Sequence, residues 1–257
     1  MNSALLILLL AADARATNDL ETWISGSGPP ERSIALAQRL PDSPAAIPRS
    51  VPDTLSAYTR RTLAAHAVQR LNAAKTDCIA STKTIFAQES IASDDPISAH
   101  FFDSAIHMES TFCLEHGTAQ EAFNIFRSAE YRTHALPLVV AYEANGDQTC
   151  MRTEPALGGT LAPTAFCSQT NVHMGDDFYG VVGWLTENTG GADHQGLFYR
   201  HYVIIFIDRP EGGVAGFRGV VTRAKTLGTL HKSVVRISAG KAHDLMRGKL
   251  NDALSSQ

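Results

Sequence analysis

Apolar residues recur along this chain with two different periods, and the change from one to the other divides the sequence. Between residues 53 and 129 they recur every three or four residues, which is typical of amphipathic helices. The clearest example is the segment 96–116, which has Pro96 in its first turn and Gly117 just after its end. Its apolar stripe comprises Ile97, Phe101, Ala105, Met108 and Phe112. We therefore predict helices over residues 53–129.

A capping box predicts where one of these helices begins. In Thr118-Ala119-Gln120-Glu121 the threonine hydroxyl can accept a hydrogen bond from the backbone N–H of Glu121. The glutamate carboxylate can reach back to the backbone N–H of Thr118. We expect a helix that starts here and contains Phe123 and Phe126.

From about residue 135 the pattern changes to short apolar runs separated by turn residues. Asn145-Gly146 is the preferred central pair of a type I′ hairpin turn, because both positions need a positive φ. Residues 197–207 are very hydrophobic, and their second half is apolar on both faces, so we expect a central strand covered on both sides. We predict an antiparallel sheet over residues 135–223 and a terminal helix over residues 238–255.

This order of elements predicts an α+β fold. We expect an N-terminal helical layer packed on a C-terminal antiparallel sheet, with a final C-terminal helix, in a single domain over residues 53–257. Residues 17–52 contain Ser25-Gly-Ser-Gly-Pro-Pro30 and four prolines between positions 41 and 52. Because these prolines cannot all lie inside regular structure, we expect a Pro-rich linker or strap there.

The first sixteen residues have the pattern of a secretory signal peptide. Residues 4–12 form an apolar run that is too short to span a bilayer as a helix, and Ala14-Arg15-Ala16 matches a cleavage site. We therefore expect cleavage after Ala16 and a secreted or periplasmic mature protein. No Lys or Arg precedes the apolar run, so a retained anchor or a buried N-terminal element is the alternative.

Charge and hydropathy limit the classes of partner. The formal net charge is −4, from 22 basic and 26 acidic residues. A general nucleic-acid binder needs a basic surface to replace counterions on phosphate, so we expect no nucleic-acid partner. No later segment is apolar enough to span a membrane, and we expect no stable membrane insertion after cleavage. The expected partner is a protein or a small-molecule ligand.

Four cysteines agree with an oxidising compartment. An even count predicts two disulfides, and we favour Cys78–Cys113 and Cys150–Cys167 because each closes a local loop. Four buried free thiols are the alternative. No pair has the C-x-x-C spacing, which argues against a zinc ribbon or a thioredoxin-like site.

One candidate metal site lies on the helix predicted over 96–116. Helical spacing would place His100, Asp103 and His107 on one polar face, where two imidazoles and a carboxylate could bind a divalent metal such as zinc. A solvated polar face explains the same pattern, because neighbouring ligands on a helix are usually four residues apart.

A second candidate site lies around the predicted sheet. Asp193 and His194 fall in a Gly-rich loop, and Arg200 and His201 begin the hydrophobic strand that follows. A neutral histidine oriented by an aspartate could act as a general base on water. Arg200 could bind a carboxylate or a phosphate. An ordinary polar loop is the alternative.

No motif fixes a reaction. The chain contains no H-E-x-x-H, no P-loop, no G-x-S-x-G and no G-x-G-x-x-G. The leading hypothesis is therefore an exported, disulfide-stabilised binding or interaction protein of unknown ligand. The alternative is an extracytoplasmic hydrolase that uses a His/Asp site, with or without a metal.

Overall fold

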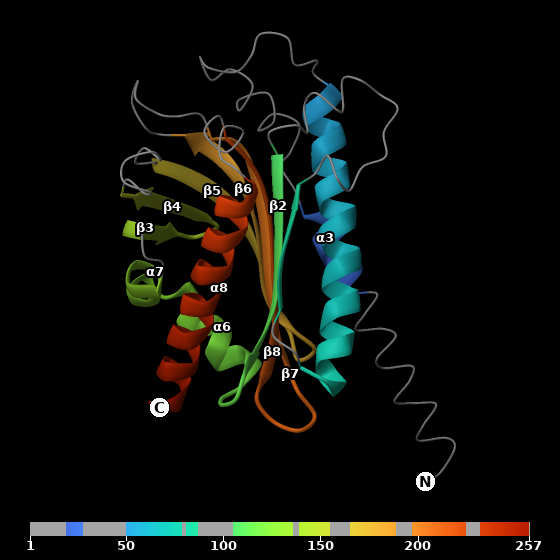
Figure 1. The fold of residues 1–257 in the computed structure, drawn as a ribbon, viewed down its shortest axis with the longest axis vertical. Helices are drawn as coiled ribbons and strands as arrows, with labels where there is room; N and C mark the ends of the chain where they lie inside the picture. The colour runs from blue at the N-terminus through green and yellow to red at the C-terminus, as the bar shows by residue number, and fades with distance from the viewer. Residues whose placement is uncertain are drawn as a thin grey trace, which may run out of the picture.

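An antiparallel sheet forms the middle of the molecule, and helices cover both of its faces (Figure 1). The computed structural model describes residues 19–27, 50–78, 81–86, 105–135, 139–154, 165–188, 197–224 and 232–256. Within these residues eight strands pair in the order β1-β2-β8-β7-β6-β5-β4-β3. The fold class is α+β, in agreement with the sequence.

The strands are β1 (Ser81–Phe86), β2 (Ala105–Leu114), β3 (Val139–Asn145), β4 (Gln148–Thr153), β5 (Ala165–Met174), β6 (Tyr179–Asn188), β7 (Leu197–Asp208) and β8 (Val214–Ala224). The principal helices are α3 (Ser50–Thr76), α6 (Ala119–Arg127), α7 (Ala129–Ala135) and α8 (Lys232–Ser255). A short helix also spans residues 19–26.

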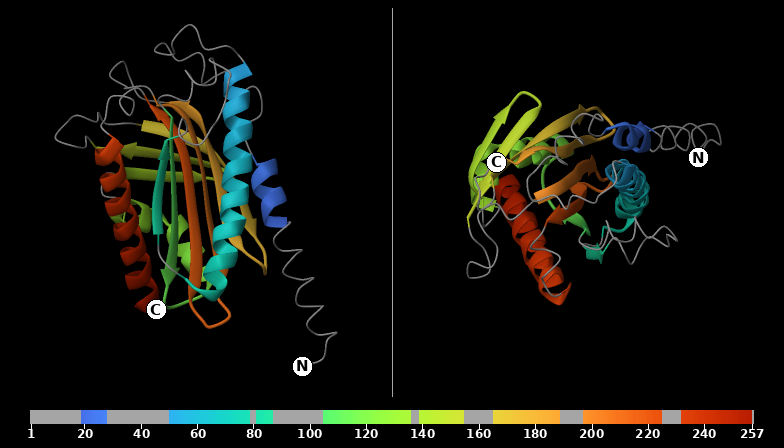
Figure 2. Two further views of the ribbon diagram at one scale, coloured as in Figure 1. Left: turned by 45° about the vertical axis from the view of Figure 1, so that its right-hand side comes forward. Right: turned by 90° about the horizontal axis from the view of Figure 1, so that it is seen from above.

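The two faces of the sheet carry different helices. Helices α6, α7 and α8 pack on the face that we call the inner face, whereas α3 and helix 19–26 pack on the outer face (Figure 2). The sheet is strongly twisted, so that β3 and β4 lie across the direction of β2 and β8 (Figure 1).

Strand β7 confirms the expectation of a central strand that is covered on both sides. Tyr202, Ile204 and Phe206 belong to the inner hydrophobic cluster. The residues between and after them, Val203, Ile205 and Ile207, belong to the outer one. Because side chains alternate across a strand, a continuous apolar run was needed to cover both faces.

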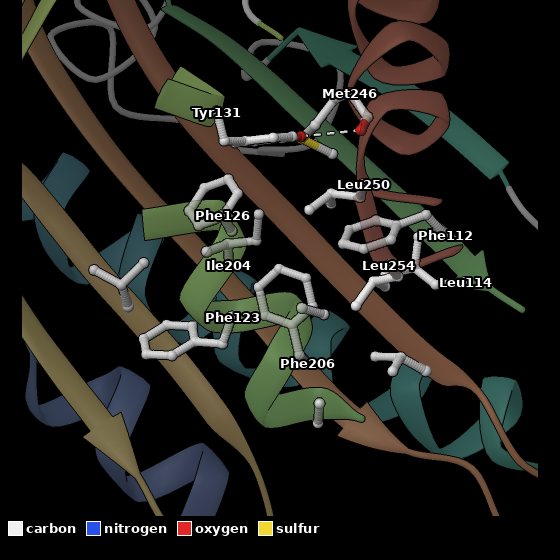
Figure 3. Close-up of a cluster of buried hydrophobic side chains, with 14 of the residues drawn as sticks. Phe112, Leu114, Phe123, Phe126, Tyr131, Ile204, Phe206, Met246, Leu250 and Leu254 are labelled. Carbon is white, nitrogen blue, oxygen red and sulfur yellow. Dashed lines mark hydrogen bonds between the residues drawn. The ribbon is translucent and has the colours of Figure 1, made fainter. Parts of the chain in front are cut away.

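The inner core is built around the ring of Phe206 (Figure 3). The Phe206 centroid lies 5.6 Å from that of Phe112 in β2, 6.1 Å from that of Phe123 and 5.8 Å from that of Phe126, both in α6. The Tyr131 hydroxyl of α7 donates a hydrogen bond to the Met246 carbonyl of α8 at 2.9 Å. These contacts join β2, β7 and the three inner helices.

The capping box at the start of α6 is confirmed. The Thr118 hydroxyl accepts from the Glu121 backbone N–H at 3.2 Å, and the Glu121 carboxylate accepts from the Thr118 backbone N–H at 2.8 Å. The Asp208 carboxylate, at the end of β7, accepts a further hydrogen bond from the Ala119 N–H at 2.7 Å. It thereby fixes α6 to the central strand.

The helix predicted over residues 96–116 is wrong where the structure describes it. Residues 105–114 form β2, which pairs with β1 on one side and β8 on the other. The spacing of Met108 and Phe112 fits a helix, but Phe112 and Leu114 also share one face of a strand. The buried polar side chains of His107 and Glu109 on the opposite face conceal the alternation that marks a strand.

Other predicted elements also differ. Residues 81–86, expected to be helical, form β1. Part of the predicted strap is a helix at 19–26, whose Leu20 and Ile24 are buried on the outer face. The β3–β4 hairpin exists, but its turn lies one residue later than predicted, because Asn145 pairs with Gln148 and the turn begins at Gly146, where φ is 61°.

Helix α3 lies close against the outer face. A Cβ atom at Gly219 in β8 would come within 2.4 Å of Leu63, so only glycine permits this approach without displacement of the leucine.

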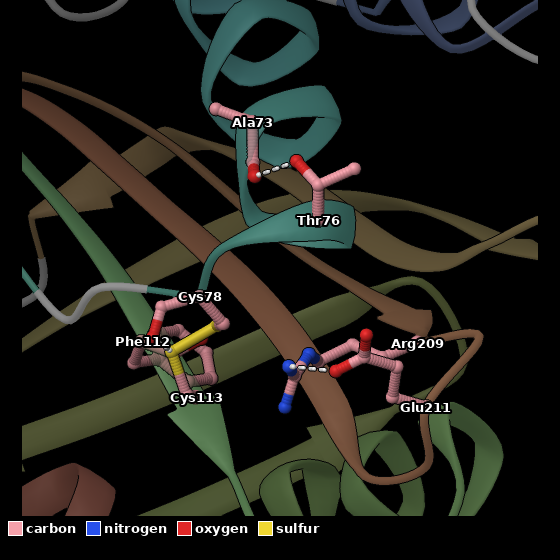
Figure 4. A network of polar contacts seen from close by, with 7 residues as sticks. All are labelled: Ala73, Thr76, Cys78, Phe112, Cys113, Arg209 and Glu211. Atoms are coloured by element: carbon pink, nitrogen blue, oxygen red, sulfur yellow. Dashed lines mark hydrogen bonds and ion pairs between the residues drawn. A yellow bond between two sulfur atoms is a disulfide. The ribbon is translucent and has the colours of Figure 1, made fainter.

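The Cys78–Cys113 disulfide joins the chain just after α3 to β2, with the two Cα atoms 5.9 Å apart (Figure 4). The second disulfide, Cys150–Cys167, joins the paired strands β4 and β5. No helix in the described parts of the chain is long and apolar enough to cross a membrane.

We predict that replacing both Cys78 and Cys113 with serine lowers the free energy of unfolding by about 3–4 kcal/mol, because the unfolded chain regains the freedom of a loop with a sequence separation of 35 residues. Urea denaturation of the oxidised wild type and the double variant measures the change. Hydrogen exchange should increase at the C-terminal end of α3 more than in α8. Equal stability together with equal exchange in α3 would contradict this role of the disulfide.

Candidate functional site

Three arginines converge on the inner face of the sheet, and we call Arg132, Arg200 and Arg218 the arginine cluster. Arg200 comes from β7 and Arg218 from β8, where it pairs with the inner-face residue Ile204. Arg132 comes from α7. Directly paired residues of an antiparallel sheet point to the same face, so Arg218 shares the inner face with Ile204. Arg200 and Arg132 reach the same face, where they contact the rings of Tyr202 and Phe126.

Aromatic rings support two of the three guanidinium groups. The Arg132 guanidinium carbon lies 3.7 Å from the ring centroid of Phe126 and 5.4 Å from that of Tyr142. The Arg200 carbon lies 4.9 Å from the centroid of Phe166 and 4.5 Å from that of Tyr202. Such stacking orients a cation and offsets part of its desolvation. Arg132 also makes a side-chain hydrogen bond with Tyr142.

Charge in this region is concentrated and of one sign. Among the residues that the structure describes, no carboxylate lies within ion-pair distance of the three guanidinium groups. Burial lowers the pKa of Arg200 to about 10, and the positive charges of Arg218 and Arg132 act in the same direction. Burial and Arg132 also lower the pKa of Arg218. The like charges of the three guanidinium groups repel one another.

An apolar row adjoins the cluster. It consists of Tyr142, Met151 and Phe166, which are paired across β3, β4 and β5. Arg132 and Arg200 stack on the two outer members of this row. A cleft of about 420 Å³ follows the same strands, but none of the three arginines lines it, and most of its lining lies on the opposite face, including Glu143 and Arg152. The combination of apolar side chains with a few charged groups, as in the row and the arginines, is typical of small-molecule sites.

Several buried polar atoms near the inner face have no hydrogen-bond partner in the described chain. They are Arg132 Nε, Ser168 Oγ and His243 Nδ1. Ser168 pairs with Leu185 in the sheet, and His243 comes from α8, with its ring 6.1 Å from that of Phe112. Buried polar groups are almost always hydrogen-bonded in native proteins, so these three atoms mark polar positions near the inner face.

A second cleft, of about 430 Å³, lies between α7 and α8. Its lining includes Glu130 and Asp252 as well as His134 and Lys249, so charges of both signs are mixed along it. It therefore lacks the concentrated positive charge of the arginine cluster, and we favour the inner-face surface formed by the cluster and the row of Tyr142, Met151 and Phe166.

The structure separates Arg200 from His201, which the sequence analysis had grouped. They are adjacent in β7, and adjacent strand residues point to opposite faces. Arg200 contacts the inner-face ring of Tyr202, whereas His201 lies on the outer face with Trp184. The two side chains therefore do not meet in one site. Asp193 and His194 lie outside the described residues.

His201 is fully buried, and both of its ring nitrogens lack a hydrogen-bond partner among the described residues. Burial lowers its pKa to about 3, and the positive charge of Arg60 contributes. His201 is therefore neutral in the folded state at neutral pH. A general-base role would also need contact with a substrate, and this side chain has no exposed surface.

The outer face carries a polar cluster that the sequence analysis did not assemble, and we call His66, His107 and Glu109 the His–Glu cluster. His107 and Glu109 lie two residues apart in β2 and share its outer face, opposite His66 of α3. His66 Nδ1 contacts Glu109 Oε1, and His107 Nε2 lies 2.8 Å from the same oxygen. Arg70 pairs with the other carboxylate oxygen at 3.1 Å.

Glu109 is a buried carboxylate whose charge is compensated locally. Burial alone would raise its pKa, but the hydrogen bonds and positive charges of His107 and His66 outweigh that effect and lower the pKa to about 2. Glu109 is thus ionised in the folded protein across the neutral range. Residues i and i+2 of a strand point to the same face, so predicting a strand here would have placed His107 and Glu109 side by side.

The metal site predicted from His100, Asp103 and His107 depended on a helix that the structure replaces with a strand at residue 107. His100 and Asp103 lie outside the described residues. His107 does belong to a group of metal-ligating side chains, but its partners are His66 and Glu109.

No family model and no curated protein matches this sequence. Solved structures that resemble it include human StAR-related lipid transfer protein 5, with a TM-score of 0.46, 14% identity and coverage of 59% of this chain and 76% of that one. A START superfamily protein from Mycobacterium smegmatis has a TM-score of 0.44 and 11% identity, covering 58% of this chain and 97% of its own. A STAR-related lipid transfer protein from Xanthomonas axonopodis has a TM-score of 0.45 and 11% identity, and the match covers 56% of this chain and 85% of that one.

We predict that His201 makes the protein less stable in acid. The unfolded histidine gains a proton below its ordinary pKa of 6.5, whereas the folded one stays neutral until about pH 3. Between these values each pH unit costs about 1.4 kcal/mol of stability. In His201→Phe the free energy of unfolding should therefore fall less steeply between pH 6.5 and 4, as measured by urea denaturation. Equal slopes in the two proteins would contradict the assignment.

Proposed function

We propose that this protein binds a small amphipathic anion on the inner face of its sheet. In this proposal Arg132 and Arg200 contact the anionic group, and the apolar part lies along the row of Tyr142, Met151 and Phe166. The observation that supports it most is the convergence of three arginines with no carboxylate in ion-pair distance among the described residues.

Energetics favour an anionic ligand over a neutral one. Burying cations without counterions is costly, and mutual repulsion among the three guanidinium groups adds to the cost. A bound carboxylate, sulfate or phosphate would offset both contributions, because arginine N–H groups form strong, charge-assisted hydrogen bonds with planar or tetrahedral oxyanions.

The apolar row beside the arginine cluster favours a ligand with an apolar body. Tyr142, Met151 and Phe166 offer two rings and a thioether side chain next to Arg132 and Arg200. Burial of apolar ligand surface supplies affinity, whereas the arginines supply specificity for charge. A simple inorganic anion would leave this wall without a partner, so the proposal specifies an amphiphile.

Export to an oxidising compartment is part of the same proposal. The two disulfides are compatible with a secreted or periplasmic location, because such bonds persist where thiols are not kept reduced. The leader-like residues 1–16 lie outside the described residues and support export by their sequence pattern alone.

The hydrolase alternative depends on Asp193 and His194, which lie outside the described residues. We prefer the binding function because the arginines proposed to bind the ligand lie in the described part of the chain and are close together on the inner face.

We predict that oleate binds at least about 10-fold more tightly than oleyl alcohol, which has the same chain but no charge. One charge-assisted hydrogen bond contributes about 1.5–3 kcal/mol, which corresponds to a difference of this size. Displacement of the neutral dye N-phenyl-1-naphthylamine, followed by fluorescence, gives both affinities. Arg132→Gln and Arg200→Gln should each weaken oleate binding by about 10-fold or more and leave the alcohol nearly unchanged.

Arg209→Gln is the matched control, because Arg209 lies in the β7–β8 turn and pairs with Glu211 at 3.9 Å (Figure 4). It should bind oleate as the wild type does. Circular dichroism and thermal melting verify that the variants fold. Equal affinity for oleate and oleyl alcohol, or oleate binding that is unaffected in both cluster variants, would overturn the proposal.

We predict that protein recovered from its native host starts at Thr17 and contains no titratable thiol before reduction. Intact mass spectrometry with and without an alkylating reagent measures both properties. Material that retains Met1 and four alkylated cysteines would contradict export.

A further inference from the structure

The His–Glu cluster lies between α3 and β2, on the face of the sheet opposite the proposed ligand site. His66 Nδ1, His107 Nε2 and a Glu109 carboxylate oxygen all lie within 4.8 Å of one another. From this geometry we propose that His66, His107 and Glu109 bind one divalent transition-metal ion of the zinc type.

The distances fit a single ion. Zinc bonds to imidazole nitrogen and carboxylate oxygen are about 2.0–2.2 Å long, so tetrahedral ligand atoms lie about 3.3–3.6 Å apart. His107 Nε2 and Glu109 Oε1 lie 2.8 Å apart, and they need to separate by less than an ångström to place an ion between them. His66 and His107 both contact the same carboxylate oxygen of Glu109, so the three ligand atoms already converge.

The chemistry of the three side chains selects the class of ion. Two imidazoles and one carboxylate form a ligand set that is found around zinc and iron(II). Calcium and magnesium prefer sites built from oxygen, so two histidine ligands disfavour them. Three protein ligands also leave a coordination position for water.

The fold fixes the position of each ligand. His107 and Glu109 are fully buried members of β2, and their i, i+2 spacing places both side chains on its outer face. The Cys78–Cys113 disulfide joins the chain two residues after the end of α3 to β2. From the end of α3 at Thr76 the helix rises about 15 Å back to residue 66, and from Cys113 the strand rises about 13 Å to residue 109 and about 20 Å to residue 107.

A neighbouring arginine orients the carboxylate. Arg70, one turn along α3 from His66, pairs with Glu109 Oε2 at 3.1 Å and so directs Oε1 toward the two histidines. Outer groups of this kind are a regular feature of metal sites. The His66 side chain is 34% exposed while the other two are fully buried, so an ion would enter along α3.

The competing interpretation is a buried ion-pair network without metal. The metal site and the metal-free network make different predictions when Zn²⁺ is titrated into full-length, oxidised protein that has been stripped with a chelator. The metal-free network predicts no saturable binding. Isothermal titration calorimetry should show one saturable site per chain. His66→Ala should weaken binding by about 100-fold or more, because losing a ligand exceeds the 10–100-fold effects of outer-shell changes. His66 is half-buried on a helix surface, so we expect this variant to fold.

His173→Ala is the matched control, because His173 also faces a carboxylate, that of Asp177, at 3.5 Å. It should bind Zn²⁺ as the wild type does. A second measurement uses Co²⁺, whose visible absorption reports tetrahedral nitrogen and oxygen ligation. The bands should appear in the wild type and disappear in Glu109→Gln, which preserves side-chain size.

Three outcomes would overturn the metal site. They are the absence of saturable binding, several weak sites without one-to-one stoichiometry, and equal affinity in the wild type and His66→Ala. Equal loss in His66→Ala and His173→Ala would also contradict it. The test is independent of oleate binding, because its variants lie on the other face of the sheet.

Discussion

The structure depends on one geometrical constraint, which is that side chains of a strand alternate between two faces, both of which are covered here. Strand β7 must supply apolar side chains to the inner core through Ile204 and to the outer core through Ile205. The same alternation places Arg200 and His201, adjacent in sequence, in separate environments. The sheet therefore divides the polar chemistry of the chain into an inner, cationic region and an outer, imidazole–carboxylate region.

The two regions differ in how their buried charge is compensated. On the outer face the Glu109 carboxylate has His66, His107 and Arg70 around it, so the described chain itself supplies the opposite charge. On the inner face the described residues bring arginines together without a carboxylate in ion-pair distance. Burying uncompensated positive charge is costly, so the inner face is a candidate for an anionic ligand. On the outer face a metal cation could take the place of the protons in the hydrogen bonds between Glu109 and the two histidines.

The sequence correctly predicted those elements whose pattern of apolar and capping residues fits only one type of secondary structure. The capping box at Thr118, the two-sided strand β7 and the α+β class follow from local hydrogen bonding and hydrophobic burial. Strand β2 was not predictable in this way, because its outer face buries His107 and Glu109 where a core strand would normally have apolar residues. Because one face is polar although it is buried, the alternation of a strand is hidden. The four-residue spacing of Met108 and Phe112 then resembles the apolar stripe of a helix.

The candidate sites were less accessible to sequence reasoning, because they join residues that are far apart in the chain. Arg200 was identified as a binder of carboxylate or phosphate, but its association with Arg132 and Arg218 depends on the packing of α7 and on the strand register. Likewise, His107 was a candidate metal ligand from its sequence, but His66 is brought to it by α3. The functional signal in this chain is therefore carried by the tertiary structure more than by any motif.

The most direct test of this division is anomalous diffraction from a crystal of the oxidised protein grown with Zn²⁺ and a brominated fatty acid. The account predicts a zinc peak between His66, His107 and Glu109 on the outer face. It predicts a bromine peak on the inner face beside Tyr142 and Phe166, with the carboxylate at Arg132 and Arg200. Zinc bound elsewhere, or a fatty acid on the outer face, would contradict it.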